Sequence, residues 1–495
     1  ALPREKILFG FFCFLAVFLA EYFLVLYGFD GFYRLNGDSL CQIAYWKTLS
    51  RPWLAGSLSA SVAKPGQVLI FGLLHQCSGD VALRLLLALL GAGLSLMLGR
   101  IAAGIGGGWA GFCGVALSVG AFSEFVRGGD SQLFLVPLLF GGLLLYYYRP
   151  PGMKKWGLLL LVLAPLFRIE AAAAVVIVLL IHLLRREWKE FAAGAGALAL
   201  SMGIWLIFMF RIQVEISRFT SAEAGYMPGP RGPFLSYFLG DLKAAFSYYS
   251  TAISLSLLAT GAAGVALRFR EWRRYLISLV PVSVIFVNYI FLGGSLLTRY
   301  FDAAFAFGLS VGVGVLFAAS SRLRLMPRKG FSIPAAALVL LPGLVFYLPS
   351  ARRLAAPPPP LEPYVADGLG LCAEKLIPAG SRLLSEDDAL YVLLMNAPDR
   401  FRKVRTLQQF NISGERGRAE TLADTDFIYL LKGGYAWYYL NIDSTCRRPG
   451  SGTDKFMTLI REIMRSNSGA GIYGVTLTPL VNDAERLVMK VERRG

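Results

Sequence analysis

Charge, histidine and cysteine are all scarce in this sequence of 495 residues. Charged side chains make up 16% of the chain, whereas an average soluble domain has roughly 25%, so an entirely soluble protein is excluded. His75 and His182 are the only histidines, which argues against a histidine-rich metal site or a histidine relay. The polar C-terminal region has no glycine-rich phosphate fingerprint at a strand–helix junction, so nothing there predicts nucleotide binding.

The six cysteines fall into two groups by their surroundings. Cys13 and Cys113 lie in apolar segments, where a thiol behaves as a small apolar core group. The other four form two pairs by position, and each pair is a candidate disulfide if its region faces an oxidising compartment. These open pairs are Cys41 with Cys77 and Cys372 with Cys446.

Apolar residues are abundant: 56% of the chain is hydrophobic. Apolar runs of about 20 residues, the length that spans a bilayer, recur through the first 350 residues. The first run lacks a small-residue cleavage site, so we expect it to remain as a span. The sequence therefore predicts an all-α polytopic membrane bundle of about eleven transmembrane helices. The expected spans are 7–28, 81–103, 108–122, 132–148, 156–167, one ending at 185, 191–210, 246–267, 276–292, 303–319 and 332–348.

The formal net charge of +17 follows from cations that gather in short loops between apolar segments. Residues 149–155, 185–189 and 268–274 are examples, and such loops are typically cytoplasmic. We therefore expect a multi-pass protein of the cell inner (plasma) membrane, with a cytoplasmic N-terminus and a periplasmic or extracytoplasmic C-terminal domain. This pattern explains the positive charge without a nucleic-acid partner, and attraction to anionic membrane lipids stays open.

The chain divides by composition. Residues 1–350 are expected to form the transmembrane domain, with outer loops at 29–79 and 211–245. Two amphipathic stretches in the first loop, 39–49 and 67–75, are predicted to lie in the membrane interface. A proline-rich linker at 351–360 leads to a small α/β soluble domain at 361–495. Its expected strands are 382–385, 427–431 and 487–491, and its expected helices are 366–376 and 454–465.

Ionisable groups at membrane depth are costly and point to function. Under the predicted topology, several such groups lie at outer ends of spans, where one cavity can collect them. A carboxylate there can act as a general base on an acceptor hydroxyl or amine. Cations there can neutralise a phosphate leaving group. The candidates are Asp38, Lys64, Arg127 with Asp130, Arg168 with Glu170, and Arg299 with Asp302.

Each candidate also has a structural interpretation, and both interpretations stay open. Asp38 can cap the helix that follows it, and Lys64 can extend its side chain to the interface. The remaining groups can cap a helix, pair across spans or anchor the chain at the interface; these are Asp130 with Arg127, Arg168 with Glu170, and Arg299 with Tyr300.

The layout resembles the GT-C superfamily of integral-membrane glycosyltransferases over essentially the whole chain. It is most similar to the branch that holds protein O-mannosyltransferases and the lipid A aminoarabinose transferase. Five short features carry the resemblance: an early acidic residue, the aromatic helix after it, a Lys-Pro segment, an Arg–acid pair and a late Arg-Tyr. Here they are Asp38, Tyr45-Trp46, Lys64-Pro65-Gly66, Arg127 with Asp130, and Arg299-Tyr300. The C-terminal region lacks the Trp-Trp-Asp motif of oligosaccharyltransferases; Ala436-Trp437-Tyr438 is not one.

The resemblance implies an inverting transfer of a sugar from a polyprenyl-phosphate donor to a lipid, glycan or protein acceptor. It implies that Asp38 is the base or acceptor-orienting group, that Lys64 binds phosphate or positions a carboxylate, and that the loop 211–245 is a lid over the site. Together with the charges at the outer span ends, it leads us to expect Asp130 as a second catalytic residue. We expect phosphate or substrate binding by Lys64, Arg127, Arg168, Glu170, Arg299, Tyr300 and Tyr45. No cofactor is implied with certainty, and a divalent metal stays open.

Two other classes compete with this interpretation. A transporter or flippase for lipid-linked sugars or small anions is favoured by the glycine clusters at 104–108 and 293–294, which are typical of broken helices. No repeat relates the two halves of the chain, which argues against that class. A membrane-anchored sensor or assembly protein leaves the charges at the outer span ends unexplained.

Overall fold

The computed structural model describes most of the first 211 residues and much of the C-terminal region. The described residues are 4–23, 37–47, 64–121, 126, 129, 132–148, 151–169, 171–211, 308–315, 317–318, 376–385, 400–407, 410, 415–431, 452–483 and 486–493. They belong to two compact units, which are described separately below. One unit comprises Ala1–Leu35, Cys77–Ile204 and Gly232–Pro358, and the other Asn36–Gln76, Trp205–Arg231 and Pro359–Gly495.

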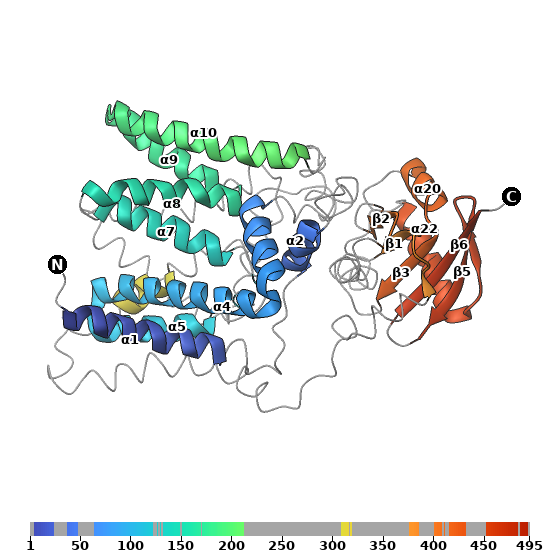
Figure 1. The fold of residues 1–495 in the computed structure, drawn as a ribbon, viewed down its shortest axis with the longest axis horizontal. Coiled ribbons are helices and arrows are strands. Elements are labelled where there is room, and N and C mark those ends of the chain that lie inside the picture. Colours follow the sequence, from blue (N-terminus) through green and yellow to red (C-terminus); the bar gives the residue numbers. More distant parts are fainter. Residues whose placement is uncertain are drawn as a thin grey trace. The chain divides into compact units, whose positions relative to one another are not determined.

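The first unit is helical (Figure 1). Its helices are rich in leucine, alanine and phenylalanine, and their ends fall at glycine, proline or charged residues. A π-helical turn over residues 21–23 extends the first of them. The described elements are α1 (Arg4–Ala20), α4 (Pro65–Gly106), α5 (Gly108–Ala121), α7 (Gln132–Tyr148), η3 (Pro151–Met153), α8 (Lys154–Phe167), α9 (Ala171–Leu184) and α10 (Trp188–Arg211).

The end of α4, α5 and the helical residues 308–315 and 317–318 pack closely around glycine. Gly107 joins α4 to α5 with φ +89°, a backbone conformation that favours glycine. A Cβ on Gly106 would overlap the carbonyl oxygen of Gly314, so these two backbones approach each other directly. Gly107 is therefore the connection between two closely packed helices, at the place where the sequence predicts the break between the spans 81–103 and 108–122.

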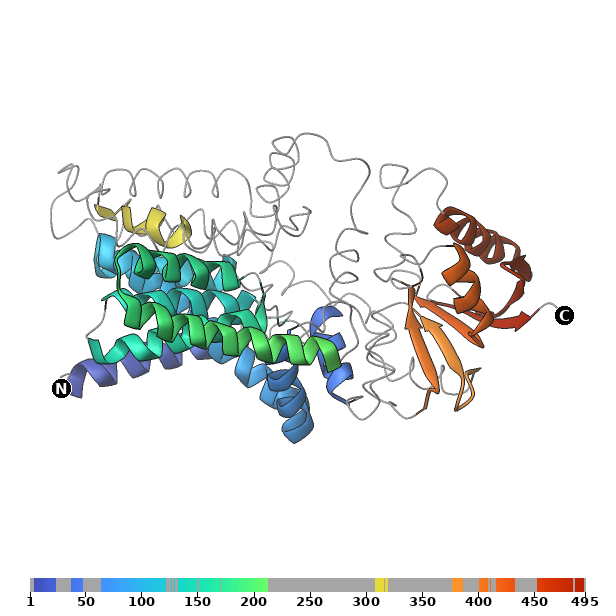
Figure 2. The same cartoon turned by 90° about the horizontal axis from the view of Figure 1, so that it is seen from above.

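Helices α7 to α10 form an antiparallel group in which α7 packs on α8 and α8 on α9 (Figures 1 and 2). The rings of Phe134 and Phe167 stack with centroids 4.6 Å apart at the junction of α7 and α8. Gly194 of α10 lies against Leu179 of α9, with Leu158 of α8 nearby. Consequently the end of α7, the start of α8, the end of α9 and the start of α10 share one end of the group.

Two described helices are long and apolar enough to cross a membrane, Val81–Gly106 and Trp188–Phe208. Four further apolar helices have 10–17 residues, and 17 residues cover roughly 26 Å of a hydrocarbon core about 30 Å thick. The expected spans 246–267, 276–292 and 332–348 lie outside the described residues. The structure thus agrees with a largely helical membrane domain, and the count of about eleven spans stays a prediction.

The C-terminal part of the second unit contains a six-stranded mixed sheet with the order β2-β1-β3-β6-β5-β4. The first three strands are parallel to one another, whereas β6 is antiparallel to both β3 and β5. The strands are β1 (Arg382–Ser385), β2 (Lys403–Thr406), β3 (Phe427–Leu431), β4 (Ala470–Ile472), β5 (Val475–Asn482) and β6 (Arg486–Arg493).

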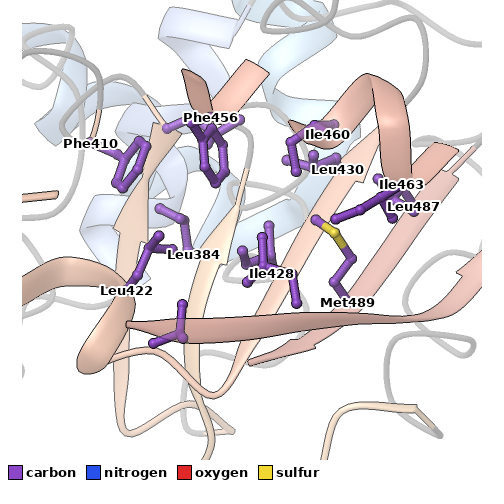
Figure 3. Packing of buried hydrophobic residues seen from close by; sticks show 13 residues of the cluster. Leu384, Phe410, Leu422, Ile428, Leu430, Phe456, Ile460, Ile463, Leu487 and Met489 are labelled. Carbon is purple, nitrogen blue, oxygen red and sulfur yellow. The ribbon is translucent and has the colours of Figure 1, made fainter. Parts of the chain in front are cut away.

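Two helices accompany this sheet, α20 (Glu415–Ala423) and α22 (Gly452–Ser466). The apolar face of α22 packs on inward-facing strand residues, as Figure 3 shows for Ile460 and Ile463 near Leu430 and Leu487. Phe410 and Phe456 meet at a centroid distance of 4.7 Å. The expected small α/β architecture is therefore present, with the three expected strands and the helix at 454–465; the expected helix at 366–376 falls almost entirely outside the described residues.

The cysteine pairs have different outcomes. Cys77 is exposed and its thiol is free, so the candidate disulfide with Cys41 is not formed in this structure. Cys372 and Cys446 lie outside the described residues, and that pair stays open. Cys113 is buried and Cys13 is partly buried, in line with their expected packing roles.

Candidate functional site

The acidic residue that heads the candidate site lies at the start of a helix. Helix α2 runs from Gly37 to Lys47, so Asp38 occupies its first turn, where the helix dipole favours a carboxylate. The Asp38 side chain is outside the described part of the structure. Further along α2, Gln42, Ile43 and Tyr45 are buried, so this short helix is an integral part of the second unit.

Helix α2 docks on the first turns of α4. The Nε2 of Gln42 donates to Oε1 of Gln67 at 3.2 Å, a buried hydrogen bond. Trp46 Nε1 donates to Oε1 of Gln76 at 2.8 Å, and the Trp46 ring lies against Gly72. These contacts join residues 25 and 30 positions apart in the sequence. We call α2 together with residues 65–76 of α4 the α2–α4 helix pair.

The contacts fix the direction of the two helices. Gln42 meets Gln67, and one turn later Trp46 meets residues further along α4, so the helices run in the same direction. Asp38 lies four residues before Gln42, on the same face of α2. Lys64 lies three residues before Gln67. The backbone positions of Asp38 and Lys64 are therefore at the same end of the α2–α4 helix pair.

Lys64 starts α4 through its backbone. Its carbonyl oxygen accepts from the backbone N–H groups of Gln67 and Val68, both at 3.0 Å, so Lys64 is the N-cap residue. Pro65 follows at the first helical position, where its missing N–H costs nothing. The sequence Lys-Pro-Gly is thus a helix start, and the half-buried Lys64 side chain belongs to a residue at a positive helix end.

The long α4 corrects one expectation. The interfacial stretch 67–75 and the span 81–103 were expected as separate elements, but α4 is continuous over 42 residues. The polar stretch 76–80 between them contains glycine but no proline. Each backbone N–H can therefore still donate within the helix, and glycine costs only about 1 kcal/mol.

Two other candidates are described. Tyr45 is 2% exposed and packs edge-to-face on Phe208 of α10, with ring centroids 5.6 Å apart, which is a packing position. Arg168 is 4% exposed and ends α8 in an extended conformation, with φ −151° and ψ 119°. Its N–H donates to Ala164 O, and its carbonyl accepts from Ala171 N, both at 3.0 Å. The roles of both residues in substrate binding stay predictions.

The remaining candidates lie outside the described residues, and their roles also stay predictions. They are Arg127, Asp130, Glu170, Arg299 and Tyr300.

Glu21 is a polar group that the sequence analysis missed. It is 1% exposed, and Ser95 Oγ of α4 donates to its Oε1 at 3.3 Å. The carboxyl group lies against Gly91, and Oε2 has no hydrogen-bond partner within the described part of the chain. The sequence does point to this residue, because Glu21 is the sole charged residue within 7–28 and charges at membrane depth indicate function.

His182 is a second missed group, since a histidine role had been argued against. Its Nε2 is 2.7 Å from the Tyr146 hydroxyl, and its Nδ1 is 2.5 Å from Glu187 Oε2. The signal is local: Glu187 N–H donates to His182 O at 2.9 Å, and Arg186 N–H to Leu183 O at 3.0 Å. These two bonds define a Schellman motif, which brings the Glu187 side chain back over His182.

The C-terminal domain holds an ion network at the starts of its parallel strands. Arg382 contacts Asp426 at 2.5 Å and Asp424 at 2.9 Å, and Lys403 also pairs with Asp424. The Arg382 hydrogen bond is the main cause that lowers the pKa of Asp426. Burial alone would raise the pKa of Asp424, but Lys403, Arg382 and Arg405 outweigh it and lower that pKa. These side chains are satisfied by one another, which indicates a structural role.

A metal ion needs several well-placed donors. Within the described residues, no group of three or more His, Cys, Asp and Glu side chains could hold one. The described side chains therefore offer no metal centre, and the divalent metal stays an open expectation.

Neither a protein-family model nor a curated protein sequence matches the chain. Among solved structures, the fold is similar to the crystal structure of the Archaeoglobus fulgidus oligosaccharyltransferase in complex with Zn and sulfate. The TM-score is 0.55 at 13% sequence identity, and the match covers 86% of this chain and 69% of that chain. At this identity the likeness concerns the fold, which the present chain shares over most of its length.

Proposed function

We propose that this chain is a membrane glycosyltransferase of the GT-C type. It moves a sugar from a polyprenyl-phosphate donor to a lipid, glycan or protein acceptor at the outer face of the inner membrane. The fold similarity to an oligosaccharyltransferase supports the class. The observation that carries the site is the Gln42–Gln67 hydrogen bond, because it sets Asp38 and Lys64 at one end of the α2–α4 helix pair.

The chemistry follows from these two groups. The acceptor oxygen or nitrogen attacks the anomeric carbon of the donor sugar, and the bond from that carbon to the phosphate oxygen breaks. Asp38 takes the proton from the acceptor as general base. The electron pair of the broken bond stays on the lipid phosphate, where the Lys64 ammonium neutralises the developing charge. A single displacement of this kind inverts the configuration at the anomeric carbon.

The arrangement of helix ends supports a phosphate at this position. The start of α2 and the start of α4 point the same way in the α2–α4 helix pair, so their positive dipole ends lie together. Lys64 adds a full charge beside them. A lipid phosphate is an anion of the size that helix starts bind, whereas a neutral sugar alone gains little from this arrangement.

The direct test is Asp38→Asn. We expect sugar transfer to be abolished, while thermal unfolding and membrane insertion match the wild-type protein, because the amide is isosteric and keeps the first turn of α2. The matched control is Glu190→Gln, which removes an exposed acid from the first turn of α10 and should leave transfer unchanged. Wild-type turnover in Asp38→Asn would remove Asp38 from the mechanism.

A second measurement identifies the donor. Native mass spectrometry of the purified protein should show a retained mass equal to a polyprenyl phosphate or its sugar conjugate. Stoichiometric retention of an unrelated small ion or solute would instead favour a transporter. Of the two glycine clusters that favour a transporter, the one at 104–108 contains a single non-helical residue, Gly107, between α4 and α5, and the one at 293–294 lies outside the described residues.

A further inference from the structure

The α7–α10 group presents a cluster of cations at one of its ends. The connections at 151–156 and 185–190 contain five basic and two acidic residues. Of the basic residues, Lys154, Lys155, Arg186 and Lys189 are exposed. Two large aromatic side chains accompany them: Trp156 is 51% exposed and Trp188 is 61% exposed. We call this set of four exposed cations and two tryptophans the basic end of α7–α10.

A chain of contacts joins the two connections into one surface. Lys154 Nζ lies over the Tyr146 ring, 5.9 Å from its centroid. The Tyr146 hydroxyl bonds to His182 Nε2, and His182 Nδ1 bonds to Glu187. Tyr146 lies in the last turn of α7, Lys154 begins α8, and His182 lies in the last turn of α9. Cations from both connections are therefore held on the same side of the group.

Two acids lie in the connections, and within the described residues neither forms an ion pair with the four exposed cations. Glu187 is engaged by His182, and Glu190 is exposed. Lys155 Nζ lies 5.7 Å from the centroid of the Trp156 ring. The Schellman motif holds the backbone of Arg186 in a turn, and the Arg186 side chain is exposed.

The apolar neighbours indicate what lies beside these charges. Leu184, the last residue of α9, is 83% exposed, and the two tryptophans are exposed at the same end of the helix group. Aromatic rings beside apolar helix ends are typical of the membrane–water boundary. Cations just outside that boundary meet lipid phosphates. The basic end thus combines an apolar edge, an aromatic layer and unneutralised positive charge.

We propose that the basic end of α7–α10 is a binding site for the phosphate head groups of anionic phospholipids. Lys154, Lys155, Arg186 and Lys189 contact the phosphates, and Trp156 and Trp188 contact the glycerol and upper acyl region. Tyr146, His182 and Glu187 are positioning residues that hold the two connections together. This site is separate from the α2–α4 helix pair, so its test is independent of sugar transfer.

The test uses the full chain in nanodiscs of phosphatidylcholine, with or without phosphatidylglycerol. Native mass spectrometry counts retained lipids, and thermal unfolding measures stabilisation. Wild-type protein should retain phosphatidylglycerol in preference to phosphatidylcholine and unfold at a higher temperature when it is present. The combined variant Lys154→Gln, Lys155→Gln, Arg186→Gln and Lys189→Gln should bind phosphatidylglycerol at least about tenfold more weakly, since each charge contributes severalfold near an anionic surface.

A matched control removes the same charge elsewhere. The combined variant Arg416→Gln, Lys455→Gln, Arg465→Gln and Lys490→Gln alters exposed cations of the C-terminal domain and should retain phosphatidylglycerol like wild type. If the first variant unfolds at a lower temperature than wild type even in phosphatidylcholine alone, the test is a salt series on the wild-type protein. Its stabilisation by phosphatidylglycerol should fall as salt screens the contacts.

Three results would overturn the proposal. The first is equal retention of the two lipids by the wild-type protein. The second is undiminished phosphatidylglycerol binding by the variant of the basic end, or an equal loss in the control variant. The third is the same stabilisation by soluble glycerol phosphate in detergent, which would make the site one for free phosphate compounds and not for lipid.

Discussion

The indole ring of Trp46 lies directly against the backbone of Gly72. A Cβ on Gly72 would overlap three atoms of that side chain, so the docking of α2 on α4 requires glycine at this position. The same ring donates its Nε1 hydrogen to Gln76 one turn later. The position of α2, the helix of the proposed base, therefore depends on a contact between Trp46 and Gly72 that leaves no room for a larger residue.

We expect Gly72→Ala to displace α2 and to lower sugar transfer strongly. The added methyl group forces the Trp46 ring outward, which disturbs the neighbouring Gln42–Gln67 bond and moves Asp38 away from Lys64. Overpacking of this kind typically costs 1–3 kcal/mol, to order of magnitude. Thermal unfolding and a transfer assay on the same preparation measure both effects.

The control lies in the same helix. A Cβ on Gly93 of α4 meets nothing within 4 Å, so Gly93→Ala should be neutral or should stabilise by up to about 1 kcal/mol through helix propensity. Equal activity in Gly72→Ala and Gly93→Ala would show that the Trp46 contact does not position the site.

Lys64→Ala should weaken donor use with little loss of stability. The backbone carbonyl of Lys64, and not its side chain, accepts from Gln67 and Val68, so the start of α4 survives the substitution. We expect KM for the polyprenyl-phosphate donor to rise or kcat to fall by at least about tenfold, a typical consequence of losing one charge-assisted contact. Lys64→Arg should recover part of the activity, whereas loss of the fold in Lys64→Ala would contradict a side-chain role.

Arg186→Gly should stabilise the protein in zwitterionic detergent. Arg186 has φ +58° at the position of the Schellman motif where glycine avoids the steric cost of a left-handed conformation. The expected gain is about 1 kcal/mol, measured as a rise in the thermal unfolding midpoint. Arg186→Lys keeps a non-glycine residue at positive φ and should leave the unfolding midpoint unchanged. A lower midpoint in Arg186→Gly would mean that the Arg186 side chain stabilises the turn.

The C-terminal domain should lose stability in acid. Arg382 holds the pKa of Asp426 below its usual value, and Lys403 and Arg382 do the same for Asp424 despite burial. A carboxylate with a lowered folded-state pKa stabilises the fold above its unfolded pKa of 3.8. That stabilisation is lost as pH falls through the lower folded-state value. We therefore expect the domain to open below about pH 4.

Pepsin cleavage of the full chain over this acidic range measures the opening. Asp426→Asn removes the titrating group. Its C-terminal domain should therefore be cleaved faster than the wild-type domain at pH 5, and its cleavage rate should rise less as pH falls. Because both carboxylates are about one-third exposed, solvent screens the network and the effect should be modest. An unchanged acid response in Asp426→Asn would assign the opening to other carboxylates.

Sequence patterns predicted the helices and strands that are determined by their own residues. The run at 132–148 is uniformly apolar and ends in tyrosines before Arg149-Pro150, so α7 was predicted at its observed bounds. Strands β1 and β3 are short apolar runs, and both were predicted. Strand β2, Lys403–Thr406, was missed because its alternation places basic residues on one face. Strand β5 was missed because Pro479 interrupts its pattern.

The candidate site was only partly predictable for a different reason. The motif residues Asp38 and Lys64 stand out in the sequence, but the contact that aligns their helices joins Gln42 to Gln67 across 25 residues. Nothing in either glutamine identifies its partner. Likewise, Glu21 meets Ser95 from 74 residues away, so a lone acid in an apolar run gave no indication of what surrounds it.

The order of strands has a consequence for how the C-terminal domain is made. Strand β6, residues 486–493, sits between β3 and β5, so it completes the middle of the sheet and not an edge. Until residues 486–493 have been synthesised, β3 keeps one side of its backbone unpaired. The two halves of the sheet therefore join only when β6 pairs with both of its neighbours, and a stop codon placed before residue 486 would leave the exposed edge of β3 free to pair with another chain.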